Sequence, residues 1–458
     1  MSRTLLIITW TCLVLSNAAR AATPTPVHEY SLKNGLKIIV KEDHRAPVVV
    51  SQVWYKVGSS YEHSGITGIS HALEHMMFKG TRKHPAGEFS RIISENGGRE
   101  NAFTGQDYTA YFQQLENSRL KISFELEADR MRNLSLPAEE YAKEIQVVME
   151  ERRLRTEDNP EALTNELFQA AAFVTSTYHH PVIGWMDDLH HIGIEDLRKW
   201  YQQWYAPNNA TVVVVGDVDP EEVHSLAEKY FGPLKPSVLA DLKPQTEIEQ
   251  VGERRIVVKA PAELPYLMMG YKVPTLKTAE HDWEPYALEV LAAVLDGGDS
   301  ARFARDLVRG KQIAASASAG YDLYARQQDL FTIDGTPAEG REITSLESAL
   351  RDQIRALREK PVEAAELDRI KAQVVANAAY ERDSTFYQAM QIGIVETVGL
   401  DRKVLDQYVD RIRAVTAQQV QDVARRYLND DKLTVAVLQP LPIEHPEMMP
   451  QPHAGPIR

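Results

Sequence analysis

His71-Ala72-Leu73-Glu74-His75 lies within the segment 66–78, whose apolar residues recur at helical spacing. On a helix, His71 and His75 are one turn apart and project from the same face. Two imidazoles placed in this way can bind one zinc ion at about 2.0–2.1 Å each. Glu74 leans toward the same face, where it can act as the general base that takes a proton from zinc-bound water. The stretch therefore predicts a helix that carries two metal ligands and a base.

A third ligand is available on a second predicted helix, residues 140–153. Glu144 and Glu151 are two turns apart on one face, and Glu150 lies on a neighbouring face. Two histidines and one carboxylate would leave the fourth zinc position open for water, as a hydrolytic site requires. The alternative is a solvated acidic face whose carboxylates pair with Lys143 and nearby arginines.

These two helices together resemble the pitrilysin / insulysin / mitochondrial-processing-peptidase family, whose inverted H-x-x-E-H motif is followed by two glutamates seven residues apart. The similarity extends from about Tyr30 to Leu438. It implies one zinc ion per chain, held by His71, His75 and Glu151, with Glu74 as the catalytic base.

The resemblance also assigns supporting roles. Glu144 matches a carboxylate that orients a ligand, and Glu150 remains the rival of Glu151 for the zinc. The stretch 97–104 resembles the family's strand beside the metal, where Asn101 and Ala102 would bind an extended peptide through main-chain hydrogen bonds. The alternative is an ordinary Gly-Gly turn that leads into a strand.

The chain contains an internal repeat. Residues 205–215 are echoed by residues 427–437, and each copy follows an amphipathic helix. Tyr286-Ala287-Leu288-Glu289-Val290 is a possible eroded counterpart of residues 71–75. With the resemblance, the repeat predicts an α+β fold of two homologous α/β-sandwich domains, half of a clamshell, with zinc in the first domain alone. The alternative is two unrelated α/β domains with a similar helix-to-strand connection.

Composition and turn signals set the expected boundaries. We predict a signal peptide at 1–21, a zinc-bearing catalytic domain at 22–236, a linker at 237–252, a homologous non-zinc domain at 253–440 and an irregular tail at 441–458. Asn34-Gly35 predicts a β-hairpin. Asp219-Pro220 predicts the start of a helix that runs to Tyr230.

The N-terminus has the three parts of an export signal: Arg3, an apolar run from Leu5 to Leu15, and Ala19-Arg20-Ala21. The apolar run is too short to span a membrane comfortably. Cleavage after Ala21 would remove Cys12 and leave a chain without cysteine, which excludes disulfides and thiol chemistry. We expect a periplasmic or secreted protein. The formal charge of −14 and the lack of a basic patch exclude nucleic acid as a partner.

Assembly is suggested by an incomplete substrate clamp. Relatives carry an Arg and a Tyr seven residues apart in the half without zinc. Here Arg309 matches the Arg, but Ser316 stands where Tyr is expected, and Tyr321 or Tyr324 could compensate. The resemblance implies a dimer. The missing Tyr favours a heterodimer with a zinc-less homologous chain.

The resulting hypothesis is a zinc-dependent endopeptidase that hydrolyses peptides or short unfolded segments. The alternative is a non-catalytic scaffold subunit of the same fold, which would have no use for Glu74 beside two ligands. The pairs His179-His180 and His190-His191 lie in a loop-like stretch and are expected to bind no metal. The aromatic cluster within 200–205 is expected in the core.

Overall fold

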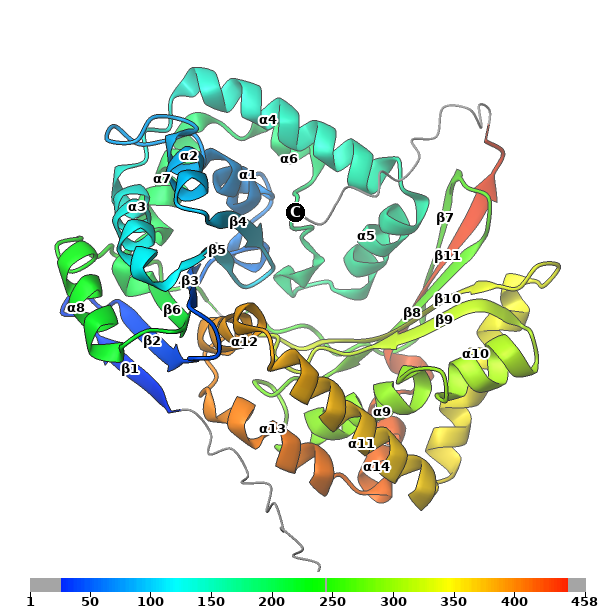
Figure 1. The fold of residues 1–458 in the computed structure, drawn as a ribbon. Helices are drawn as coiled ribbons and strands as arrows, with labels where there is room; N and C mark the ends of the chain where they lie inside the picture. Colours follow the sequence, from blue (N-terminus) through cyan, green and yellow to red (C-terminus); the bar gives the residue numbers. More distant parts are fainter. Residues whose placement is uncertain (1–25, 244, 444–458) are drawn as a thin grey trace, which may run out of the picture.

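The computed structural model, which describes residues 26–243 and 245–443, contains two mixed β-sheets (Figure 1). The first has the strand order β1-β2-β6-β3-β5-β4 and the second β7-β11-β8-β10-β9. The first sheet contains β1 (Val27–Ser31), β2 (Lys37–Glu42), β3 (Val48–Tyr55), β4 (Arg99–Thr104), β5 (Thr109–Glu116) and β6 (Ala210–Gly216). The second contains β7 (Arg254–Pro261), β8 (Tyr266–Val273), β9 (Ala314–Gly320), β10 (Asp329–Pro337) and β11 (Leu433–Leu441). The predicted signal peptide with Cys12, and residues 444–458 of the predicted tail, lie outside the described residues.

The two sheets share one topology. β2 pairs in parallel with β6, and β7 pairs in parallel with β11. The next neighbours, β6-β3-β5-β4 and β11-β8-β10-β9, are all antiparallel. Strands β2 to β6 therefore correspond one to one with β7 to β11, and β1 adds one strand to the first sheet. This confirms two homologous α/β domains and excludes two unrelated ones.

Helices cover both sheets. Those of the first half are α1 (Ile69–Met76), α2 (Glu88–Glu95), α3 (Leu120–Asn133), α4 (Ala138–Arg152), α5 (Pro160–Ala172), α6 (Met186–His191), α7 (Ile194–Trp204) and α8 (Pro220–Tyr230). Those of the second are α9 (Trp283–Asp296), α10 (Ile343–Glu359), α11 (Ala364–Glu381), α12 (Thr385–Thr397), α13 (Lys403–Ala414) and α14 (Ala417–Tyr427). Further helical segments include the 3-10 helix η1 (Ser59–Tyr61) and the π-helices η3 (Arg153–Glu157) and η6 (Phe303–Gly310). Across the described ranges, no helix has the length and apolar character needed to cross a membrane.

Local sequence signals explain several of these ends. Gly35 has φ +91° in the β1–β2 hairpin, a conformation that favours glycine. The Asn34 side chain beside it donates to the carbonyl oxygen of Phe231 at 2.8 Å. Asp219 caps α8 by accepting the first backbone N–H groups, and Pro220 occupies the first helical position. The predicted hairpin and helix start are therefore confirmed.

The two halves exchange one helix each (Figure 1). α5 of the first half packs on β7, β8 and β11, and α12 of the second half packs on β3 and β6. Glycines permit both close approaches: a Cβ at Gly270 would lie 2.5 Å from the Phe168 ring, and one at Gly393 would lie 2.0 Å from the Trp54 ring. Because each sheet buries a helix from the other half, the two domains form one packed unit.

The predicted aromatic cluster lies in the core of the first half. Trp200, Tyr201, Trp204 and Tyr205 are all buried, as expected. The ring of Tyr205 stacks on Tyr55 of β3, with centroids 4.2 Å apart. Helix α7, which carries most of the cluster, packs on α1, and α4 packs on α1 as well. Helix α1, which carries His71 and His75, is therefore packed against both α7 and α4.

Candidate metal centre

Helix α1 presents one face to the core and the other to α4. Ile69, Leu73 and Met76 are buried, whereas His71 and His75 project from the opposite side. The helix begins after Gly68, which has φ +88°. The buried carboxylate of Glu62 accepts hydrogen bonds from the backbone N–H groups of Gly68 (2.7 Å) and Ser70 (2.8 Å). Burial raises the pKa of Glu62 to about 7, although these hydrogen bonds favour its charged form.

His71, His75 and Glu151 converge in space. Each offers one ligand atom, and the three atoms all lie within 4.8 Å of one another. The Glu151 Oε2 atom is 3.3 Å from His75 Nε2 and 3.9 Å from His71 Nε2. Tetrahedral zinc with bonds of about 2.0–2.1 Å separates its ligand atoms by roughly 3.3 Å. The spacing and the donor set fit a zinc ion with one position left open.

Glu150 points away from the histidines. Its carboxylate is 60% exposed and pairs with Arg153 at 2.9 Å. Glu151 is 16% exposed and also pairs with Arg155 at 2.6 Å. Of the two candidates, the structure thus brings Glu151 to the histidines.

Glu144 lies behind His75. Its Oε1 atom is 3.0 Å from His75 Nδ1, so the ring can donate to it and direct Nε2 toward Glu151. Lys79 binds the other oxygen of Glu144 at 2.5 Å. A carboxylate that bonds the outer nitrogen of a ligating histidine is a common feature of metal sites.

The pKa values of the two histidines shift in opposite directions. Burial, with His75 nearby, lowers the pKa of His71 to about 4, so His71 is neutral at pH 7 and has a free lone pair. Its Nδ1 atom is buried without a hydrogen-bond partner. Burial also lowers the pKa of His75, but the hydrogen bonds to Glu151 and Glu144 outweigh it and the net shift is upward. The hydrogen bond from His75 lowers the pKa of Glu151.

Glu74 lies beside the cluster and bonds to the edge strand. Its Oε2 atom accepts the hydroxyl hydrogen bond of Thr104, the last residue of β4. Burial raises the pKa of Glu74, and the Thr104 hydrogen bond partly offsets this rise. A half-buried carboxylate with a raised pKa suits a general base.

Asn101 and Ala102 lie on β4, the last strand of the first sheet, which contacts α1. β4 pairs with β5 along one edge. The Asn101 side chain is exposed, and its Oδ1 atom accepts from the Ala102 N–H at 2.9 Å. Peptide binding at this edge stays a prediction.

Arg309 does not reach this cluster. It lies in η6 of the second half and donates to the carbonyl oxygen of Asp299. Ser316 pairs with Thr336 inside the second sheet. Tyr321 donates to the carbonyl oxygen of Pro274 at 2.6 Å. Within this chain, these residues supply no clamp to the histidine cluster.

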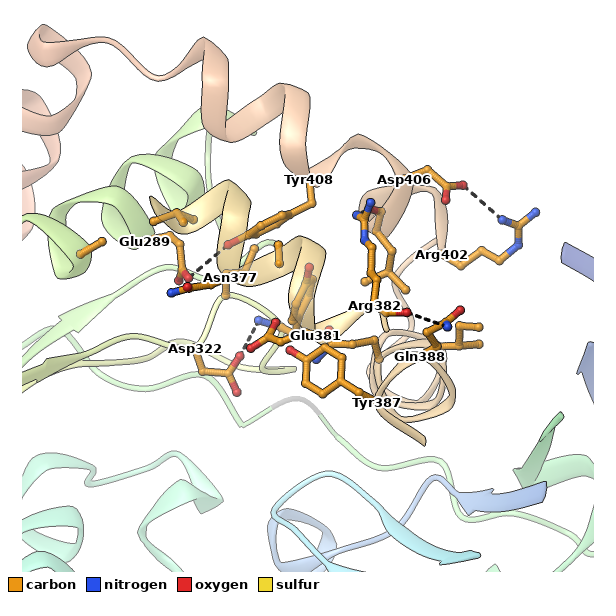
Figure 2. Close-up of a pocket in the computed structure, with 18 of the residues that line it drawn as sticks. Glu289, Asp322, Asn377, Glu381, Arg382, Tyr387, Gln388, Arg402, Asp406 and Tyr408 are labelled. Atoms are coloured by element: carbon orange, nitrogen blue, oxygen red, sulfur yellow. Dashed lines mark hydrogen bonds and ion pairs between the residues drawn. The ribbon is translucent and has the colours of Figure 1, made fainter. Parts of the chain in front are cut away.

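The second half carries the counterpart of α1. α9 follows β8 and contacts β9 as α1 follows β3 and contacts β4, so the two helices occupy equivalent places. The sequence match of residues 286–290 to residues 71–75 would place Glu289 at the position of Glu74. Glu289 lies in a cavity of about 1050 Å³, where Tyr408 donates to it at 3.3 Å (Figure 2). Burial raises the pKa of Glu289 to about 7. Among the described residues, a group of three potential metal ligands occurs in the first half alone. The two histidine pairs at 179–180 and 190–191 do not belong to this group.

Comparisons with known proteins agree with this geometry. The family model described as Insulinase (Peptidase family M16) matches residues 37–184, and the Peptidase M16 inactive domain matches residues 191–374. A Helicobacter pylori protein named zinc protease PqqE is 34% identical over 93% of this chain and 96% of its own length. The chain belongs to peptidase family M16.

Solved structures show the same fold for this M16 chain. The crystal structure of a protease from Helicobacter pylori matches 91% of this chain and 100% of its own with a TM-score of 0.86 and 31% identity. The periplasmic protease PqqL from Escherichia coli has a TM-score of 0.75 at 18% identity; the match covers 92% of this chain and 48% of that chain. This two-domain chain therefore corresponds to about half of the PqqL fold, as the half-clamshell prediction expects.

Sequence reasoning missed three side chains around the cluster of this M16 chain. Thr104 holds Glu74, Lys79 holds Glu144, and Glu62 caps α1. Lys79 lies beyond the end of α1, so helical spacing does not indicate its contact with Glu144. Glu62 and Thr104 carry no local signal, because loop and sheet geometry bring them to α1.

Proposed function

We propose that this chain is a zinc-dependent endopeptidase that hydrolyses peptides or short unfolded segments. The observation that carries the proposal is the convergence of His71, His75 and Glu151 within 4.8 Å beside Glu74. The names of the M16 relatives as zinc proteases support it.

His71, His75 and Glu151 would hold one zinc ion per chain. Zinc there would supply Lewis acidity toward a peptide carbonyl and toward water. Glu74 takes the proton of the attacking water and can return it to the leaving amine. Thr104 fixes the orientation of the Glu74 carboxylate. Glu144 fixes the ring of His75.

The free edge of β4 would bind the substrate. Its neighbour is β5 on one side, and an extended peptide can pair with the other side near Asn101 and Ala102. Thr104 ends this strand, so a peptide aligned along it would run close to Glu74.

Activity would require a dimer, because one chain supplies half of a closed chamber and closure would limit access of water. Ser316 stands where the family has Tyr, which supports a clamp supplied by a second, zinc-less homologous chain. Peptidase activity across a dilution series tests this. Full activity of an isolated monomer would contradict the dimer requirement, and full activity of a pure homodimer would contradict the preference for a heterodimer.

We also propose export to the periplasm or medium, supported by the N-terminal sequence.

Glu74→Gln tests the activity itself. The amide cannot accept the proton of water, so turnover should fall by a factor of about 10²–10⁴ while zinc content and folding stay unchanged. Zinc is measured by atomic absorption, and turnover with a quenched fluorescent peptide. A variant that keeps both zinc and normal turnover removes Glu74 from this role. A wild-type protein that binds zinc but cleaves no peptide favours the scaffold alternative.

A further inference from the structure

Two equivalent hairpin turns meet where the halves join. The β4–β5 turn, residues 105–108, contains Asp107, and the β9–β10 loop, residues 321–328, contains Arg326. The Arg326 Nε atom donates to Asp107 Oδ1 at 3.0 Å, and its backbone N–H donates to Oδ2 at 3.1 Å. The guanidinium also donates to Ser60 Oγ at 2.7 Å and lies 4.6 Å from the Tyr61 ring centre.

Asp107 depends on this contact. Its carboxylate is buried and also accepts the hydroxyl groups of Ser60, at 2.6 Å, and Tyr178. Arg326 is its ion-pair partner, and among the described residues no other cation pairs with it. Burial lowers the pKa of Arg326, but the Asp107 charge outweighs this and the net shift is upward. Removing the guanidinium would leave a buried carboxylate without a counter-charge.

One path leads from Arg326 to helix α1. Ser60 lies in η1, two residues before Glu62. Glu62 accepts the N–H groups of Gly68 and Ser70 at the start of α1. The guanidinium therefore holds the segment that fixes the N-terminus of the helix bearing Glu74.

A second path leads to strand β4. Thr104, which donates to Glu74, is followed directly by the turn that contains Asp107. The turn and η1 also bond to each other: the Ser60 N–H donates to the carbonyl oxygen of Gln106 at 2.8 Å. A Cβ at Gly58 would lie 2.3 Å from the carbonyl oxygen of Gly105, so the two segments are in close contact. A small displacement at this junction would therefore move both the β4–β5 turn and η1.

We propose that Arg326, from the second half, is a positioning residue for Glu74 of the first half. It fixes the spacing between α1, which carries Glu74, and β4, which carries the Thr104 that orients it. The inference rests on the proposed peptidase function. It gives the half that matches the inactive domain a direct part in the geometry of the active half. Misplacement of a catalytic group by about 1 Å can lower a rate by about 100-fold.

The test compares zinc-loaded full-length wild type, Arg326→Gln, Arg326→Lys and Asp107→Asn. The matched control is Arg302→Gln, which removes a guanidinium bound to Glu366 by two hydrogen bonds inside the second half. For Arg326→Gln we expect kcat to fall by about 10- to 100-fold with KM changed by less than about twofold. Arg326→Lys keeps the charge and should recover part of kcat. Asp107→Asn should behave like Arg326→Gln.

Hydrogen–deuterium exchange gives a readout independent of activity. Arg326→Gln should speed exchange in residues 59–77 and 99–108 and leave the core of the second half unchanged. A kcat loss no larger than that of Arg302→Gln, or faster exchange throughout the chain, overturns the proposal. If zinc-loaded wild type cleaves no peptide, the proposed function fails, and the exchange pattern alone decides whether Arg326 holds the two segments.

Discussion

Thr104 donates a hydrogen bond to the carboxylate of Glu74 and so joins strand β4 to helix α1. The same strand offers its free edge to an extended peptide. One residue therefore links the proposed substrate strand to the proposed base. The orientation of Glu74 and the position of a bound peptide are set by a common element.

Replacing Thr104 by Val should remove this link. We expect kcat to fall about tenfold, part of the 10²–10⁴ that a general base contributes, with zinc content unchanged. The Thr104 hydrogen bond lowers the pKa of Glu74 against the effect of burial, so its loss should raise that pKa further. Because Glu74 acts as a carboxylate, the acid limb of the pH–kcat/KM profile should move to higher pH. Thr104→Ser keeps the hydroxyl and should restore both. An unshifted profile in the Val variant would contradict this.

Glu144→Gln should weaken metal binding without abolishing it. The Glu144 carboxylate accepts from His75 Nδ1 and so orients a proposed ligand. Loss of such a partner lowers metal affinity by about 10- to 100-fold. Competition with a chelator measures the affinity. Glu140→Gln is the matched control, since Glu140 lies on the same helix and pairs with Lys143 in solvent. Equal affinities for both variants would remove Glu144 from this role.

Glu151→Gln should lose most of the bound zinc, whereas Glu150→Gln should keep it. The Glu151 Oε2 atom lies 3.3 Å from His75 Nε2, and Glu150 points to solvent. An amide oxygen is a weaker zinc ligand than a carboxylate. Zinc per chain after dialysis is the measurement. The reverse result would place the third ligand one residue earlier.

The local part of the site was readable from the sequence. His71 and His75 share a helix face because their spacing is one turn, and the Asn34-Gly35 turn follows from backbone preferences. Only the family resemblance favours Glu151 over Glu150 as the third zinc ligand, because either carboxylate would suit a solvent-exposed acidic helix. The structure separates them because one is 16% and the other 60% exposed.

The non-local part was not readable. Asp107 and Arg326 are 219 residues apart, and no sequence pattern around either residue indicates that they pair. The helix exchange was equally hidden, because the apolar faces of α5 and α12 do not specify which sheet they cover. The close contacts of Gly270 and Gly393 with aromatic rings become meaningful only once the sheets are placed.

The predicted linker contains a buried anchor that should make stability depend on pH. Glu247 pairs with Lys272, their side chains 1% and 4% exposed, and accepts the N–H groups of Val174, Thr175 and Ser176. Burial alone would raise its pKa, but Lys272 and these hydrogen bonds lower it from 4.5 to about 2. A depressed carboxylate pKa adds stability above the unfolded-state value, and this is lost as pH falls through the folded-state value. The stabilisation should therefore be full above about pH 4.5 and decline toward pH 2.

Glu247→Gln should lower the free energy of unfolding by about 3 kcal/mol at pH 7, because Lys272 stays buried without its partner. The difference from wild type should shrink between pH 4.5 and pH 2, where the wild-type carboxylate becomes protonated. Urea unfolding at several pH values measures this. Glu249→Gln, two residues away and exposed, is the control and should change stability by less than about 0.5 kcal/mol at every pH. A Glu247→Gln deficit that stays constant down to pH 2 would show that shape, not charge, holds the linker to the two halves.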